Sequence, residues 1–324
     1  MYIGGCRVEE NKIPVGISSC LLGEEVRFNG GHKQSRFCLD HLSRVFEFQG
    51  FCPEVAIGMG VPREPIRLVG SIDAPRAVGT VDASVDVTDA LAAYGDEIGK
   101  LSYSLCGYIL MKNSPSCGLY SAKVYTPKGG VLPGKHAGIF ARALKAVNPL
   151  LPLEEEGRLN DALLRENFIA RVFAYSDWRS SVGEQPTANK IVKFHSRYKY
   201  MLMAHGQKPY RELGQMVAGA GTAQIDSFAA TYIAAFMAAI TKPASRKGHS
   251  NTLYHMLGYL REEVPGEARQ ALAASIEEYR KGIVNLAVPV ALLKHYLKMH
   301  GSDYIKAQAY LEPYANDLGL RNQI

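Results

Sequence analysis

The sequence predicts an α/β N-terminal domain with a mostly parallel sheet, followed by an all-α helical-bundle domain. In the first half, short apolar runs such as residues 13–18 (IPVGIS) alternate with segments of helical spacing such as residues 88–101, a pattern typical of parallel sheets. The second half repeats an apolar period of about 3.6 residues in one segment after another. Residues 148–161 combine two prolines with three consecutive glutamates, so we expect domains over residues 1–152 and 153–324.

The elements of the first domain follow from the length of their apolar runs. Runs of about four to eight residues are of strand length, whereas longer segments with apolar residues three or four apart are typical of helices. Asp86 or Thr88 precedes one such longer segment and is suited to cap its N-terminus. In chain order, the expected elements are strands at residues 13–18, 48–51 and 106–111 and helices at residues 32–46 and 88–101.

The second domain is expected to be helical throughout, with short connections between antiparallel neighbours. Its longest apolar run, residues 227–240, is too short to span a bilayer and predicts a buried helix. The expected helices cover residues 155–175, 190–205, 210–220, 223–240, 249–263, 265–281 and 288–300.

The composition is that of an ordinary globular protein and gives no indication of a secreted protein. The 324 residues, of which 47% are hydrophobic and 21% charged, suffice for two ordinary globular domains. The net charge of +6 is only mildly basic and does not by itself indicate nucleic acid. The first residues, MYIGGCRVEENKIPVG, lack the apolar core of a secretory signal. We therefore expect a cytoplasmic protein that binds no membrane.

Three of the six cysteines share a context, because Cys20, Cys52 and Cys117 each follow an expected strand. In a parallel sheet the loops after the strands meet at one edge, so these thiols can converge. Their separations of 32 and 65 residues match neither zinc motifs nor ferredoxin motifs. They fit a [4Fe-4S] cluster held by three cysteines with one open iron, or else small buried thiols that cap strands. Cys6, Cys38 and Cys106 lack the loop context, so we expect them to be small buried thiols rather than cluster ligands.

Three motifs, SSCLLG, FCPE…GMGVPREP and NSPSCG, occur in this order and resemble the thiouracil desulfidase (TudS) family over about the first 150 residues. The segments KFHSRYKYMLMAH and YRELG resemble the all-helical YbgA-type domain. The fusion of the two resembles the bacterial tRNA 4-thiouridine desulfidases (RudS). The resemblance implies a [4Fe-4S]-dependent enzyme that converts thiouridine and water into uridine and hydrogen sulfide, without net electron transfer.

The resemblance also implies roles for individual residues. Cys20, Cys52 and Cys117 would each ligate one iron, and the fourth iron would bind the thiocarbonyl sulfur of the substrate. Glu54, two residues after a ligand, would act as general acid and base. Without the resemblance, Glu54 at the start of a short helix is equally suited to capping.

The neighbouring polar residues are candidates for holding the substrate. Ser114 would pass a proton or hold the substrate edge, and Ser116 and Asn113 would bind the substrate, although serines here also suit a turn. The sequence does not decide which serine meets the substrate. Arg63, bracketed by prolines, suits a substrate phosphate or ring contact, or alternatively a surface ion pair.

Residues 190–211 combine cations with aromatic side chains and contain no acidic residue, and residues 241–250 form a second basic patch in an expected inter-helix loop. Cations neutralise phosphates and aromatic faces stack unpaired bases, so the fusion predicts tRNA binding. The alternative is a solvated basic face over a packed stripe. The expected RNA contacts are Lys190, Lys193, Arg197, Tyr198, Lys199, Lys208, Arg211, Lys242, Arg246 and Lys247.

Two other functions fit the same motifs. The enzyme would act on free thiouracil or thionucleotides, with the helical domain serving oligomerisation, or the chain would be a non-catalytic iron–sulfur sensor that binds RNA. No DNA partner is expected, and the sequence leaves open whether the protein is a monomer or a homodimer.

Overall fold

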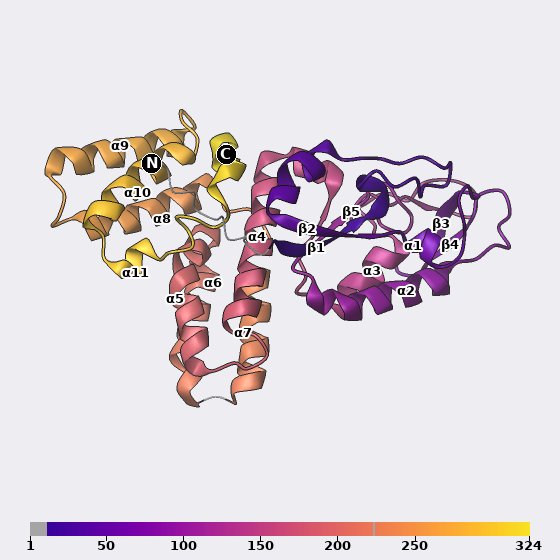
Figure 1. Ribbon diagram of the computed structural model, residues 1–324, viewed down its shortest axis with the longest axis horizontal. Helices are drawn as coiled ribbons and strands as arrows, with labels where there is room; N and C mark the ends of the chain where they lie inside the picture. Colours follow the sequence, from indigo (N-terminus) through magenta and orange to yellow (C-terminus); the bar gives the residue numbers. More distant parts are fainter. Residues whose placement is uncertain (1–11, 223) are drawn as a thin grey trace, which may run out of the picture. The chain divides into compact units, whose positions relative to one another are not determined.

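The computed structural model describes residues 12–222 and 224–324, so Cys6 and the rest of the first segment lie outside the described residues. The chain divides into two compact units, and the boundary falls between Gly157 and Arg158 (Figure 1). This boundary lies beyond the expected one because β7 (Leu153–Glu155) completes the sheet of the first unit.

The main sheet of the first unit has four parallel strands. β1 (Ile13–Ser18) lies between β2 (Phe46–Phe51) and β5 (Tyr108–Leu110), and β7 lies beyond β5. Gly16 in β1 is required by packing, since the ring of Tyr108 lies where its Cβ would be. The carboxyl ends of β1, β2 and β5 therefore meet at one edge, as the sequence predicted.

A second, smaller sheet was not expected. In it β3 (Ile66–Gly70) pairs antiparallel with β4 (Pro75–Gly79) and parallel with β6 (Val124–Tyr125). Two helices, α2 (Thr88–Leu101) and α3 (Ile139–Val147), lie side by side in this unit (Figure 1). Their close approach depends on glycines of α2, because a Cβ at Gly95 or Gly99 would lie 2.6 Å from a carbon of α3.

Two local expectations in this unit are wrong. The cap of α2 is Val87, because the carboxylate of Asp86 accepts from the backbone N–H of Thr88 (2.9 Å) and the Thr88 hydroxyl accepts from Ala77 (2.8 Å). No continuous helix covers residues 32–46, which hold only short π-helical and 3-10 turns before β2 begins. The reason is that Lys33 donates its backbone N–H to the carbonyl oxygen of Cys20 (2.9 Å), which ties this segment to the end of β1.

The second unit is helical, as predicted, with a core rich in aromatic side chains. In the described part of the chain, no helix is both long and apolar enough to cross a membrane. The helices are α4 (Ala162–Ser181), α5 (Ala188–His205), α6 (Gln207–Ala218), α7 (Ile225–Ala239), α8 (Arg246–Leu257), α9 (Gly266–Lys281), α10 (Ala287–His300) and α11 (Asp303–Lys306).

Two helix starts differ from the sequence prediction for reasons that their caps explain, and a third cannot be compared. The first helix begins at Ala162 rather than at residue 155, because the Asp161 side chain caps it by accepting from the backbone N–H of Leu164 (3.0 Å). The second basic patch is only partly a loop, since Ser245 caps α8 and its hydroxyl accepts from Gly248 (3.1 Å). The expected start of the helix over residues 223–240 lies outside the described residues.

Candidate active site

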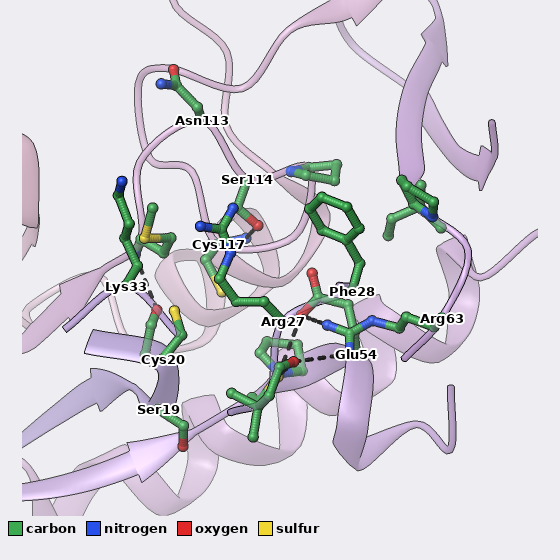
Figure 2. A pocket seen from close by; sticks show the side chains of 18 of the residues that line it. Ser19, Cys20, Arg27, Phe28, Lys33, Glu54, Arg63, Asn113, Ser114 and Cys117 are labelled. Atoms are coloured by element: carbon green, nitrogen blue, oxygen red, sulfur yellow. Dashed lines mark hydrogen bonds and ion pairs between the residues drawn. The ribbon is translucent and has the colours of Figure 1, made fainter. Parts of the chain in front are cut away.

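Three cysteines line one cavity of about 440 Å³ at the carboxyl edge of the main sheet. Cys20 lies in the turn after β1, Cys52 follows β2 at the start of α1 (Pro53–Ala56), and Cys117 lies in the loop after β5. Figure 2 shows the sulfur atoms of Cys20 and Cys117 near each other, with Arg27 and Glu54 beside them. Parallel pairing of three strands thus brings together residues that are widely separated along the chain.

The turn that carries Cys117 explains why the sequence reads NSPSCG. The Ser114 hydroxyl accepts from the backbone N–H groups of Ser116 (3.2 Å) and Cys117 (3.0 Å). Asn113 adopts a positive φ of 56° at the entry, a conformation that asparagine tolerates better than most residues. Gly118 closes the turn, because a Cβ there would lie 2.7 Å from the carbonyl oxygen of Ser114.

A buried carboxylate anchors the segment that follows Cys117. Glu155 in β7 is 3% exposed and accepts from the backbone N–H groups of Leu119 (2.7 Å), Tyr120 (2.9 Å) and Ser121 (3.0 Å). The Ser121 hydroxyl donates to the same oxygen (2.6 Å). Four donors to a single oxygen fix the position of this segment relative to the sheet. The sequence analysis missed this role because it placed Glu155 in a helix.

The donor set fits an iron–sulfur cluster better than a single metal ion. Among the described residues, no three His, Cys, Asp or Glu side chains are grouped so that they could hold a single metal ion. A cluster instead contacts its ligands at separate corners, which suits thiols that line a cavity. Burial, followed by the neighbouring Cys52 thiol, raises the pKa of Cys20 to about 12, and burial raises the pKa of Cys117 well above its ordinary range. Metal binding would displace the protons that these thiols retain.

Glu54 is held at the wall of the cavity by two contacts. The Ser116 hydroxyl donates to its Oε1 (2.8 Å), and Nη2 of Arg63 lies 3.8 Å from its Oε2. Its side chain is 13% exposed, and Oε2 lies 3.7 Å from the Cys52 sulfur. No side-chain hydrogen bond caps α1, so the capping alternative for Glu54 is not what the structure shows.

Arg63 is committed to the protein rather than free for a substrate phosphate. Its Nη1 donates to the carbonyl oxygens of Val26 (2.9 Å) and Gly60 (3.0 Å), and its side chain is 7% exposed. The ion pair with Glu54 is therefore buried and not the surface pair that the sequence allowed. Arg63 ties the loop after β1 to the carboxylate, which makes it a positioning residue.

The predicted substrate-binding residues separate into different positions. Ser114 lines the cavity, whereas Ser116 is fully buried, does not line it and holds Glu54. Ser116 is therefore corrected from a substrate contact to a positioning residue. Asn113 is exposed and lies at the rim, away from Cys20, Cys117 and Glu54 (Figure 2).

The loop after β1, which covers one side of the cavity, was not predicted from the sequence to contribute to the site. Arg27 and Phe28 line the cavity from this loop, and the Arg27 guanidinium carbon lies 5.8 Å from the centre of the Phe28 ring. Lys33 and Lys112 line it as well. The available signal was a cation next to an aromatic residue in the loop after a strand that ends at a cysteine.

The basic residues predicted to contact RNA differ in whether they have partners. Lys190 donates to the carbonyl oxygen of Gln185 (2.8 Å), Arg197 pairs with Asp177 (2.9 Å), Lys208 lies 3.8 Å from Glu212, and Arg246 donates to the carbonyl oxygen of Tyr279 (3.0 Å). By contrast, five of these cations form no ion pair in the described part of the chain, namely Lys193, Lys199, Arg211, Lys242 and Lys247.

Tyr198 cannot stack a base in this fold. It is 3% exposed and stacks on Phe194, with ring centres 4.5 Å apart, inside the aromatic core of the helical unit. The prediction that Tyr198 contacts RNA is therefore wrong. For this residue the alternative interpretation, a solvated basic face over a packed stripe, agrees with the structure.

Comparison with known proteins gives a match for each unit. Residues 15–156 match the family model for 2-thiouracil desulfurase, and residues 199–315 match the DUF1722 family of proteins of unknown function. The uncharacterized protein YbgA of Escherichia coli (strain K12) is 31% identical over 158 residues, which cover 48% of this chain and 94% of YbgA. The uncharacterized protein YbbK of Bacillus subtilis (strain 168) is 35% identical over 164 residues, which cover 45% of this chain and 98% of YbbK.

Among solved structures, the [4Fe-4S]-dependent thiouracil desulfidase TudS is similar, with 27% identity, a TM-score of 0.36, and coverage of 46% of this chain and 95% of TudS. The two sequence-family matches cover different parts of the chain and do not overlap. The chain therefore belongs to the 2-thiouracil desulfurase family through its first unit and to the DUF1722 family through its second.

Proposed function

We propose that this protein is a [4Fe-4S]-dependent desulfidase that removes sulfur from 4-thiouridine in tRNA. The observation that carries the proposal is the cavity in which Cys20, Cys52 and Cys117 lie together with Glu54. Membership of the 2-thiouracil desulfurase family supports a thiolated pyrimidine as the reacting group. The cations of the helical unit that form no ion pair among the described residues support a substrate that carries phosphates.

The three thiols would hold the cluster, and the turn around Ser114 and the Glu155 carboxylate keep the Cys117 loop in position. A bound [4Fe-4S] cluster would supply an open iron that polarises the thiocarbonyl group through its sulfur. Phe28 is 40% exposed at the cavity and offers a ring face for the pyrimidine. Arg27 lies beside it and balances negative charge near the thiols, since its guanidinium lowers the pKa of Cys20 against the larger effect of burial.

Glu54 is suited to move the protons of the reaction. The Ser116 hydroxyl donates to Oε1, so Oε2, which lies 3.7 Å from the Cys52 sulfur and 3.8 Å from Nη2 of Arg63, is the oxygen that takes a proton from water as the water attacks the thiocarbonyl carbon. Glu54 then returns this proton to the sulfur and the carbon–sulfur bond breaks. The new hydroxyl group loses its proton as it becomes the uridine carbonyl, and this proton is the second proton of hydrogen sulfide. Thiouridine and water give uridine and hydrogen sulfide, so the electrons balance without an oxidant or reductant.

The test uses the anaerobically purified, cluster-loaded full chain and tRNA that contains 4-thiouridine, followed by nucleoside analysis. The wild type is expected to convert 4-thiouridine into uridine. Glu54→Gln keeps the Ser116 hydrogen bond but cannot accept the proton, so the rate should fall by about 10²-fold or more. Iron content and visible absorbance should stay unchanged.

The matched control is Glu47→Gln, an exposed glutamate on β2 that does not line the cavity. It removes the same charge and should leave the rate unchanged. Undiminished turnover by Glu54→Gln with a full cluster, or a loaded wild type that leaves 4-thiouridine intact, contradicts the proposal.

Free thiouracil is the second candidate substrate, because the matching family model is described as a 2-thiouracil desulfurase. The two candidates differ in their response to salt. Binding of tRNA through phosphates should weaken steeply as salt rises, whereas turnover of an uncharged base should not. Activity on free thiouracil alone, with no conversion in tRNA, favours this second candidate.

A further inference from the structure

A second cavity lies within the helical unit, away from the cysteines. Its volume is about 610 Å³, and three helices supply its lining. The stripes of α5 and α6 that face it recur at three- and four-residue spacing, and Tyr304 of α11 closes one side. The lining residues that matter for binding are His195, Lys199, Tyr210, Arg211, Gly214 and Tyr304.

The two cations of this cavity have no acidic partner in the described part of the chain. The Lys199 ammonium lies 6.0 Å from the centre of the Tyr304 ring and 5.7 Å from that of Tyr200. Arg211 is exposed and forms neither an ion pair nor a hydrogen bond among the described residues. Their neighbours Arg197 and Lys208, on the same two helices, are paired with carboxylates. The positive charge that lines the cavity is therefore not balanced by a carboxylate of the described residues.

A neutral histidine adds a hydrogen-bonding group to the cavity. Nδ1 of His195 lies 3.1 Å from the hydroxyl of Tyr232, which is fully buried and has no other partner among the described residues. Burial lowers the pKa of His195 to about 4, so the ring is neutral at physiological pH. The Tyr232 O–H then donates to Nδ1, and Nε2 carries the remaining hydrogen. A Cβ at Gly214 would lie 3.9 Å from Nε2, so glycine keeps that side of the ring open.

We propose that this cavity binds one unpaired nucleotide of an RNA chain, with phosphate at Lys199 and Arg211 and the base against Tyr210 or Tyr304. Tyrosine faces beside fixed cations suit a stacked base and its phosphate, whereas an acidic peptide would use the cations but not the rings. The volume falls in the range of sites that hold small organic ligands. The site extends the RNA-binding role proposed above but does not depend on the desulfidation chemistry.

The test measures binding of fluorescein-labelled hexauridine to the full chain by fluorescence anisotropy at several salt concentrations. The double variant Lys199→Gln/Arg211→Gln should weaken binding about tenfold and reduce the slope of log K against log salt by about 1.4. The matched control, Arg280→Gln/Lys281→Gln, removes the same charge from α9 outside the cavity, where both cations pair with Glu277. It should change the affinity by less than about twofold.

A second probe, a hexamer with one 2-aminopurine, reports base stacking through quenching of its fluorescence on binding. Quenching should occur with the wild type and be lost in the cavity double variant. If both double variants weaken hexauridine binding equally, the cavity is not the binding site, and a diffuse basic surface binds the RNA instead. The proposed ligand is wrong if hexaglutamate binds as tightly as hexauridine and the cavity double variant loses this binding. The cavity would then bind an acidic peptide instead of a nucleotide. Each readout stands even if the protein converts no thiouridine, because none of them measures turnover.

Discussion

The cavity of the first unit and the basic helices α5 and α6 of the second unit both present polar side chains, but the two regions fix the positions of these side chains differently. Glu54 and Ser116 are 62 residues apart in sequence and meet at 2.8 Å, while Lys208 and Glu212 meet within one helical turn. The first arrangement requires the whole fold, whereas the second requires only a helix. A site assembled from distant residues is specific evidence of function, and a local charge pattern becomes evidence only when its partners are known.

The largest expected effect tests the cysteine cavity directly. Cys117→Ala removes one of the three thiols, so the protein should lose its cluster together with more than about 10³-fold of its activity, as expected when a metal site loses a ligand. Iron content and visible absorbance after anaerobic loading are the measurements. Cys38→Ala is the control, because Cys38 is fully buried but does not line the cavity. Equal iron in both variants would falsify the three-thiol site.

The second prediction tests how the fold holds the site. Glu155→Ala leaves three backbone N–H groups without their acceptor, which should lower the free energy of unfolding of the first unit by about 3 kcal/mol. Hydrogen exchange should accelerate at residues 119–121, and Glu155→Gln should have a smaller effect because it retains an acceptor oxygen. Unchanged protection at these three amides in Glu155→Ala contradicts the anchoring role.

The same comparison shows what the sequence could predict. The bounds of β1 and α2 follow from their apolar patterns, and the meeting of the three cysteines follows from parallel pairing. The role of Glu155 did not follow, because a run of glutamates is normally solvated and nothing local indicates the four donors of a distant loop.

The roles of the residues in the loop after β1 could not be predicted from the sequence either. Arg27 and Phe28 lie in a segment without periodicity, so sequence pattern gives no direction for their side chains. The hydrogen bond between Ser116 and Glu54 depends on how β2 and β5 each pair with β1, which no short motif encodes. In the helical unit, apolar spacing correctly predicted a core stripe, and Tyr198 was misassigned because its aromatic character was given more weight than its position.

A third prediction concerns the pH dependence of the stability of the helical unit. Burial, and then the charge of Arg321, lowers the pKa of His249 well below its ordinary value of about 6.5. The unfolded chain therefore binds a proton that the folded unit excludes, and stability falls as pH drops below about 6.5. By pH 5 this linkage should cost the helical unit about 2 kcal/mol, measured by denaturant unfolding.

The control for this prediction is His249→Asn, which keeps a polar group near Tyr310 but does not titrate. The variant is less stable at pH 7, yet its loss between pH 7 and pH 5 should be smaller by about the same 2 kcal/mol. An identical pH dependence of wild type and variant argues against a role of His249.

The smallest expected effect compares two cations of α5. Lys193 is exposed and forms no ion pair among the described residues, whereas Arg197 is paired with Asp177. If the helical unit binds tRNA, Lys193→Gln should weaken binding a few-fold and lower the salt slope by about 1, because it removes one phosphate contact. Arg197→Gln should do less, since that charge is already balanced within the protein. Both variants keep the helix and change the net charge equally, so they differ only in whether the lost cation was paired. A larger effect of Arg197→Gln would mean that RNA binding breaks the ion pair with Asp177. The distinction between paired and unpaired cations would then no longer predict the RNA-binding surface.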